Sequence, residues 1–255
     1  MHVAITGASS GIGAALAREF GTPGNVLTLV ARRRALLEAL SDALGVRTHV
    51  VVADLSDTAR CADWIAGAES ALGPVDVLIN NAGSTMVRRF VDVDLEEAER
   101  MLRLDFVNPL RLTRAVLPGM LARGSGTIVD VCSIAAFAAL LGTTYYAAAK
   151  AGLAAASEVL RGELRGSGVH VVTVYPGPIR TAMSTQAFES FEDRWTKKLA
   201  AEAAPEKLAA KIRLAVERRK PRVVFPGSFA LVRRLPNTTR RLLDRFTPPI
   251  RRPAL

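Results

Sequence analysis

Short runs of β-branched and aliphatic residues alternate along most of the chain with longer amphipathic segments rich in alanine and leucine. This alternation is typical of parallel βαβ units. The expected strands are His2–Thr6, Val26–Val30, Thr48–Val52, Val75–Asn80, Thr127–Cys132, His170–Tyr175 and Arg222–Phe225. The expected helices are Gly11–Phe20, Ala35–Leu44, Thr58–Leu72, Leu95–Leu121, Thr144–Gly166 and Pro205–Arg218.

Seven strands predict one α/β domain with a doubly wound parallel sheet over residues 1–227. After Pro226-Gly227 the alternation stops, and residues 228–255 form a basic, proline-punctuated tail. Apolar residues of the tail recur at three- and four-residue spacings between arginines, and Pro236 interrupts them, so we expect two short amphipathic helices. Two roles stay open. The tail either docks on the protein and covers a substrate entrance, which we favour, or makes peripheral contact with an anionic membrane.

Composition excludes several protein classes. The 255 residues are 49% hydrophobic and 23% charged, which is enough to bury a core and argues against disorder. Cys61 and Cys132 lie in no cysteine or histidine cluster, so we expect neither a disulfide framework nor a metal site. No basic and apolar leader precedes the first strand, and we expect a cytoplasmic protein.

The net charge of +10 is concentrated near the carboxyl end. Residues 206–255 hold 14 basic and 3 acidic residues, whereas residues 1–205 carry a net charge of −1. A nucleic-acid enzyme more often spreads positive charge over a groove or a recognition helix, and no aromatic-rich motif accompanies these arginines. We therefore expect no nucleic-acid partner.

A glycine-rich motif, Thr6-Gly7-Ala8-Ser9-Ser10-Gly11-Ile12-Gly13, lies between the first strand and the first helix. Glycines in such a turn let the backbone approach a pyrophosphate, whose charge the free amides and dipole of the helix stabilise. The alternative is a tight turn without a ligand. The position of the motif favours dinucleotide binding.

This motif resembles the cofactor motif of the classical short-chain dehydrogenases/reductases, and other elements of that family follow in order. The resemblance covers about residues 1–227 and implies a Rossmann-like fold. It also implies an adenine contact at Asp54 and Leu55, a supporting Asn-Ala-Gly element, and a nicotinamide loop. The cofactor-binding residues that it implies are Gly7, Ser9, Ser10, Gly11, Ile12, Gly13, Asp54, Leu55, Asn81, Ala82, Gly83, Tyr146, Lys150, Pro176, Gly177, Ile179 and Thr181.

The same resemblance identifies Ser133, Tyr146 and Lys150 as catalytic. Residues four apart share a helix face, and an ammonium beside the Tyr146 phenol favours the phenolate. Ser133 can hydrogen-bond the substrate oxygen while Tyr146 gives or takes its proton. A Tyr-x-x-x-Lys pair alone is usually a solvated helix face, but here it stands in register with the other motifs. Tyr145 is turned off that face, and we interpret it as a pocket wall or a packing residue.

The family often carries an asparagine in the long fourth helix that helps to relay protons toward the lysine. Matching of the downstream Leu-Thr-Arg-Ala-Val-Leu-Pro segment puts Asp105, and not Asn108, at that position. We therefore include Asp105 among the candidate catalytic residues. The alternative is that Asp105 faces solvent.

Cofactor preference depends on the end of the second strand, where NAD-preferring members usually carry an acid. This chain has Ala31 and then Arg32-Arg33-Arg34. Arginine suits a 2′-phosphate, so we expect NADP(H), with Arg32 as the first contact, Arg33 as the second, and Arg34 in solvent.

The sequence thus predicts an NADP(H)-dependent oxidoreductase that interconverts a ketone or aldehyde and an alcohol. The alternative is a non-catalytic NADP(H)-binding redox sensor of the same fold. Phe188, Phe191 and Trp195 either line an apolar pocket or pack a lid, and the segment 137–141 supplies the opposite wall, so an apolar substrate is preferred. Family members commonly associate through the alanine-rich helix Tyr146 to Leu164 and its predecessor, so we expect a homo-oligomer.

Overall fold

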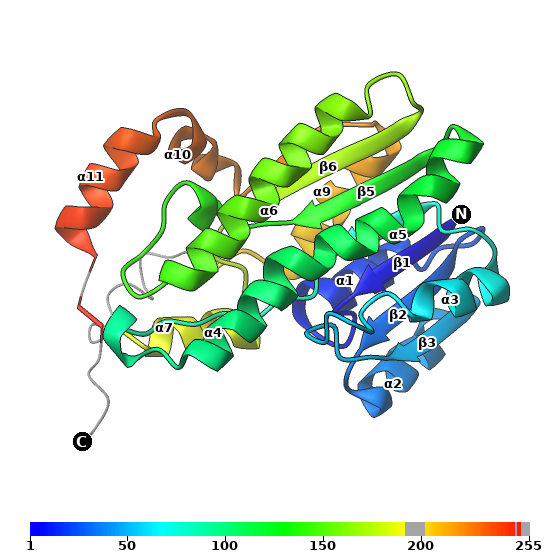
Figure 1. Cartoon of the computed structure of the whole chain (residues 1–255), viewed down its shortest axis with the longest axis horizontal. Helices are drawn as coiled ribbons and strands as arrows, with labels where there is room; N and C mark the ends of the chain where they lie inside the picture. The colour runs from blue at the N-terminus through cyan, green and yellow to red at the C-terminus, as the bar shows by residue number, and fades with distance from the viewer. Residues whose placement is uncertain (192–201, 248, 251–255) are drawn as a thin grey trace.

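A computed structural model describes residues 1–191, 202–247 and 249–250 (Figure 1). Seven strands pair in parallel in the order β3-β2-β1-β4-β5-β6-β7, which is a Rossmann-like arrangement. The strands are β1 (His2–Thr6), β2 (Val26–Ala31), β3 (Thr48–Val52), β4 (Val77–Asn80), β5 (Gly126–Val131), β6 (Val169–Pro176) and β7 (Arg222–Phe225). The predicted fold is confirmed.

Helices cover both faces of the sheet and bury two apolar clusters against it (Figure 1). One face carries α1 (Gly11–Phe20), α2 (Arg34–Leu44) and α9 (Pro205–Glu217). The other carries α3 (Trp64–Leu72), α5 (Asn108–Arg123) and α6 (Thr144–Glu163). The strand order reverses between β1 and β4, so a crevice opens at their carboxyl ends.

Two expected helices differ from the structure. The helix expected at Thr58–Leu72 begins only at Trp64, because the Asp57 side chain accepts a hydrogen bond from the amide of Ala59 at 3.0 Å and holds a turn. The helix expected at Leu95–Leu121 is wrong as one element. It consists of α4 (Leu95–Leu102), a π-helical turn over Arg103–Val107, and α5. The π turn matters for the site, because π turns inside α-helices occur frequently at functional sites.

The described part of the tail contains two short helices, α10 (Ala230–Arg234) and α11 (Pro236–Phe246), as predicted from Pro236. Both lie at the same end of the molecule as α4 and as α7 (Ala182–Glu189), away from α2 and α3 (Figure 1). Among the described residues, none of the helices combines the length and the apolar character needed to cross a membrane.

Candidate functional site

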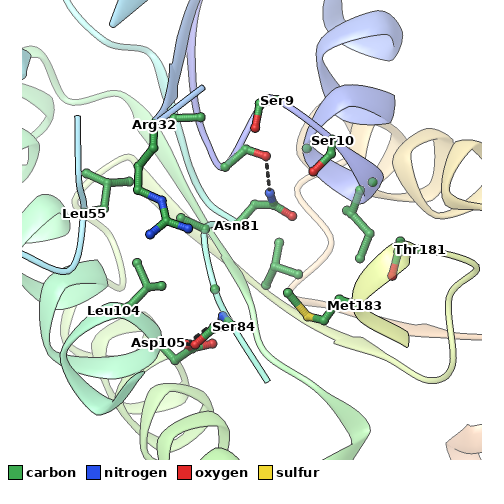
Figure 2. Close-up of a pocket in the computed structure, with 18 of the residues that line it drawn as sticks. Ser9, Ser10, Arg32, Leu55, Asn81, Ser84, Leu104, Asp105, Thr181 and Met183 are labelled. Carbon is green, nitrogen blue, oxygen red and sulfur yellow. Dashed lines mark hydrogen bonds between the residues drawn. The ribbon is translucent and has the colours of Figure 1, made fainter. Parts of the chain in front are cut away.

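A cavity of about 280 Å³ opens at the carboxyl ends of the central strands (Figure 2). Most of the predicted site residues line it, and they come from the first, second, third and fourth strand ends as well as from α6 and the loop after β6. The predicted residues along its wall are Gly7, Ser9, Ser10, Gly11, Ile12, Gly13, Arg32, Arg33, Asp54, Leu55, Asn81, Ala82, Gly83, Asp105, Lys150, Pro176 and Thr181.

The glycine-rich turn approaches its neighbours too closely for side chains. A Cβ atom on Gly13 would lie 2.1 Å from the carbonyl oxygen of Gly7, and Gly7 itself has a φ of 68°. Ser10 caps α1 without a side-chain hydrogen bond, and the first turn of α1 contains no acidic residue. The amides at this helix end therefore face the cavity and suit a phosphate group.

Thr6 and Asn81 hold the turn in place. The Thr6 Oγ1 accepts the backbone amides of Asn81 at 2.9 Å and Ala82 at 3.0 Å, and the Asn81 Nδ2 donates to the Thr6 carbonyl at 2.8 Å. The Asn-Ala-Gly element thus ties the end of β4 to the glycine-rich turn. Thr6 opens the motif in the sequence, but its supporting role becomes visible only in the structure.

The arginines after β2 lie at one end of the cavity. Arg33 donates from Nη2 to the Oγ atoms of Ser9 at 2.9 Å and Ser10 at 2.7 Å. Figure 2 shows Arg32 reaching across the cavity between Leu55 and Asn81. Together these side chains give this end of the cavity a positive charge.

Arg34 and Asp54 lie near these arginines and differ from them in their surroundings. Arg34 is exposed and pairs with Glu38 one turn along α2 at 3.3 Å, as expected of a residue in solvent. Burial raises the pKa of Asp54, but hydrogen bonds from the amide and hydroxyl of Ser56 outweigh that effect and lower the pKa below its ordinary value, so this carboxylate stays charged near the cavity.

Lys150 and Asp105 form a buried ion pair at the inner end of the cavity, with 2.9 Å between Nζ and Oδ1. The Lys150 Nζ also donates to the Val131 carbonyl at 3.2 Å. The other oxygen of Asp105 accepts the amide of Ser84 at 2.9 Å and its hydroxyl at 3.2 Å (Figure 2). The idea that Asp105 faces solvent is therefore wrong, because the π turn points its side chain into the cavity.

Asn108, the other candidate in this helix, points elsewhere. Its Nδ2 donates to the Leu55 carbonyl at 2.7 Å, and its side chain is fully buried. The structure thus supports the alignment that gives Asp105 the position facing the lysine.

Charges around Tyr146 oppose one another. Burial raises the pKa of its phenol, the Lys150 ammonium and a hydrogen bond with Ser133 lower it, and Asp105 raises it again. Lys150 thus lowers the pKa of Tyr146, as predicted, but burial and Asp105 keep that pKa above its ordinary value. Burial likewise lowers the pKa of Lys150, but Asp105 and Tyr146 raise it by more, and the ammonium stays charged.

Comparisons with known proteins agree with this geometry. The family model of the short chain dehydrogenases matches residues 1–192. The chain belongs to this family.

Relatives extend the match beyond those residues. A fatty acyl-CoA reductase of Mycobacterium tuberculosis is 38% identical over 198 residues, which are 74% of this chain and 67% of the relative. The ketoacyl reductase HetN of Nostoc is 30% identical over 226 residues, 87% of this chain and 77% of the relative. A short-chain dehydrogenase from Sphingobium yanoikuyae, solved in complex with NADPH, superposes with a TM-score of 0.81 at 31% identity and covers 100% of this chain and 97% of its own. This short-chain dehydrogenase is therefore an NAD(P)-dependent oxidoreductase acting on a carbonyl or alcohol.

Four predicted site residues of this dehydrogenase do not belong to the cavity wall: Ser133, Tyr146, Gly177 and Ile179. Tyr145 stacks its ring on Phe90, with 5.7 Å between the centroids, which agrees with a packing role. Ile179 is buried in the core, and Gly177 lies under the Phe229 ring, where a Cβ would come within 2.8 Å of Cε2. Trp195 lies outside the described residues.

Three further residues of the cavity wall were not among those predicted: Ser84, Leu104 and Met183. Ser84 follows the Asn-Ala-Gly element directly, and Met183 and Leu104 line the cavity near Thr181 and Asp105 (Figure 2). Serine and methionine at these positions carry no distinctive pattern in the sequence. Ser84 reaches the cavity because of the turn after β4, and Met183 because α7 begins there.

The tail of the dehydrogenase packs on segments beside this site. The Arg240 Nη1 donates to the Ala139 carbonyl at 3.4 Å, and Arg233 lies over the Tyr175 ring, 5.8 Å from its centroid. An antiparallel bridge joins Ile250 to Phe191 at the end of α7. These contacts agree with the docked position of the tail that the sequence analysis favoured, and they assign Phe191 a packing role.

Proposed function

We propose that this protein is an NADP(H)-dependent short-chain dehydrogenase that reduces the carbonyl group of an apolar, acyl-chain-like substrate. The observation that carries the proposal is the buried Lys150–Asp105 pair beside Tyr146, at the inner end of a cavity suited to a dinucleotide. A non-catalytic sensor would not need a buried ammonium next to a phenol, because burial of charges costs stability.

The residues of the cavity fit a dinucleotide. Gly13 lies so close to Gly7 that no side chain fits there, which keeps the backbone of the turn open to a pyrophosphate. No side chain caps the first amides of α1, so these amides are free to donate to it. The bound cofactor supplies the hydride. Thr181 at the start of α7 and Pro176 at the end of β6 line the cavity in the region that the family uses for the nicotinamide.

Preference for NADP(H) rests on charge. Ala31 ends β2 without a carboxylate that could bind a ribose hydroxyl, and Arg32 and Arg33 follow. Arg33 already lies on the hydroxyls of Ser9 and Ser10, so a 2′-phosphate there would accept from one guanidinium and two hydroxyls.

Tyr146 acts as the proton donor to the substrate oxygen, and Ser133 orients that oxygen. Because the pKa of Tyr146 lies above its ordinary value in the protein alone, the phenol carries its proton at neutral pH. That state suits carbonyl reduction. Lys150 stabilises the phenolate left after transfer, and Asp105 holds Lys150 in position.

The surroundings of the site favour an apolar substrate. Met183 lines the cavity, Phe137 packs on Tyr175 with 5.1 Å between centroids, and Met86 is buried with Tyr146 beside it. The relatives named above are a fatty acyl-CoA reductase and a ketoacyl reductase, which supports a carbonyl on an aliphatic chain.

The test is a substrate screen with the purified protein, following NADPH consumption. The panel contains long-chain aldehydes and ketoacyl thioesters, with sugar ketones as polar controls. We expect turnover of the aliphatic carbonyls with NADPH and little with NADH. The Tyr146→Phe variant gives the background rate of NADPH consumption. Cofactor binding without turnover on the whole panel would favour the redox sensor.

A further inference from the structure

Exposed apolar side chains gather at one end of the protein. Among the described residues, eight of the fourteen exposed large apolar side chains lie on the loop before α4, the start of α4, the loop before α6, the start of α7, and the tail. We call these eight the apolar rim. They are Phe90, Val91, Leu95, Leu141, Met183, Leu231, Leu235 and Leu242.

Contacts join several of the segments that carry the rim. The Arg88 amide donates to the Gly142 carbonyl at 3.0 Å, which joins the loop before α4 to the loop before α6. Ile250 lies against Gly142, where a Cβ would come within 2.5 Å of Cδ1, and bridges to Phe191 after α7. Figure 1 shows α4, α7, α10 and α11 at the same end of the molecule.

The tail supplies both apolar surface and charge. Leu231, Leu235 and Leu242 are each more than half exposed, although the contacts of Phe229 and Arg233 hold α10 against the body. Residues 228–255 carry seven arginines and one acidic residue, a net charge of +6. Exposed leucines among arginines are typical of helices that lie in the headgroup region of a bilayer.

We propose that the apolar rim and the basic tail dock on an anionic membrane surface, with the substrate entrance facing the lipid. Charge selects this occupant. A second copy of the chain would bring another tail of the same sign against the first, whereas anionic headgroups are complementary to it. The rim would enter the interface, while the arginines stay among the headgroups. The proposal goes beyond the oxidoreductase function and does not depend on turnover.

The experiment is vesicle co-sedimentation of the full chain saturated with NADPH. Phosphatidylcholine vesicles with and without phosphatidylglycerol are compared at low and high salt. We expect binding to the anionic vesicles that weakens at high salt, because salt screens the attraction of the arginines. Leu231→Glu and Leu242→Glu should each lower the partition coefficient by about tenfold or more, since each removes apolar area and adds repulsion.

Leu36→Glu on α2 is the matched control, because Leu36 is also exposed, at 44%, but lies at the opposite end of the molecule. It should bind like the unchanged protein. NADPH binding confirms that each variant is folded. The comparisons of lipid composition and salt use the unchanged protein and test the proposal without any variant. The proposal would be overturned if the protein did not bind anionic vesicles, or if Leu36→Glu lost as much vesicle binding as the two tail variants. It would also be overturned if Leu242→Glu had a lower particle mass in light scattering, because that would indicate a second copy of the chain on the rim.

Discussion

Asp105 Oδ1 lies 2.9 Å from Lys150 Nζ inside a site where the family resemblance predicts an asparagine. Both side chains are buried, and Ser84 holds the second oxygen of Asp105 with two hydrogen bonds. A full negative charge therefore stands next to the ammonium that tunes Tyr146. This charge sets the proton affinity of the phenol higher than the lysine alone would.

The Asp105→Asn variant should shift the pH profile of carbonyl reduction to lower pH. In the proposed reaction Tyr146 must carry its proton to donate it, so the rate should fall as pH rises through its pKa. The charge of Asp105 raises that pKa, and its removal lowers it, so the fall begins at a lower pH. The pH dependence of kcat measures the shift.

Ser84→Ala is the matched control for this variant, because it removes a hydroxyl from Asp105 but leaves the charge. It should leave the pH profile in place. Asp105→Ala removes the partner of a buried ammonium and should lower turnover by about 10²-fold. A profile that moves to higher pH in Asp105→Asn would contradict the role of the charge.

Tyr146→Phe removes the transferable proton and should lower turnover by at least about 10²-fold with cofactor binding nearly unchanged. Tyr145→Phe keeps the stacked ring on Phe90 and should have little effect. Steady-state kinetics and NADPH titration separate the two effects. Greater damage from Tyr145→Phe would show that the neighbouring tyrosine donates the proton.

The chain pattern predicted the sheet well because its strands are buried on both faces. All five residues of β1 and all four of β4 are buried, and such runs have no other stable environment. The helix expected at Leu95–Leu121 shows the limit. Its apolar spacing continues through Arg103–Val107, whereas in the structure this segment is a π turn whose Asp105 pairs with Lys150 on another helix.

The site, like the fold, was predictable from the sequence only in part. The motifs predicted that Lys150 and the glycine-rich turn belong to one site, and both line one cavity together with Asp105. The contact of Arg33 with Ser9 and Ser10 was not foreseeable, since adjacent arginines look alike in the sequence. Side-chain direction after β2 decides which of them reaches the turn.

Arg33→Ala and Arg32→Ala should each raise the KM for NADPH by about tenfold and leave the KM for NADH nearly unchanged, because each would remove a proposed charge-assisted contact to the 2′-phosphate. Arg34→Ala is the control, since Arg34 pairs with Glu38 on the surface. Steady-state kinetics with NADPH and with NADH give the ratio of the two KM values for each variant. Equal KM values for NADPH and NADH in the unchanged protein would remove the preference altogether.

The outer face of α6 predicts a homo-oligomer. Ala148 and Ala155 are exposed, and Val159 is exposed one turn further, so the face is small and apolar enough for a helix to approach closely. Light scattering over a dilution series should give a dimer or larger, and Val159→Glu should lower the mass. A monomer at all concentrations would contradict this arrangement.

Glu158 on α6 lies between the side chains of Arg161 and Arg222. Its carboxylate accepts from the Arg222 Nε at 2.6 Å, from the Tyr175 hydroxyl at 3.0 Å, and from Arg161. Burial raises the pKa of Glu158, but the hydrogen bonds from Arg222 and Arg161 lower it by more, to about 2. The carboxylate therefore links α6 to β6 and β7 behind the site.

Glu158→Gln should lower the free energy of unfolding by about 1–3 kcal/mol at neutral pH, because the amide cannot replace a carboxylate between two guanidinium groups. The folded pKa lies below the ordinary value of 4.5, so the stabilisation is present above that pH and is lost as pH falls toward about 2. The difference between variant and unchanged protein should accordingly shrink over this range in urea unfolding. Glu163→Gln, an exposed acid on the same helix, should show no difference at any pH. A Glu158→Gln deficit that persists undiminished at the acid end would mean that packing, and not charge, gives this residue its effect.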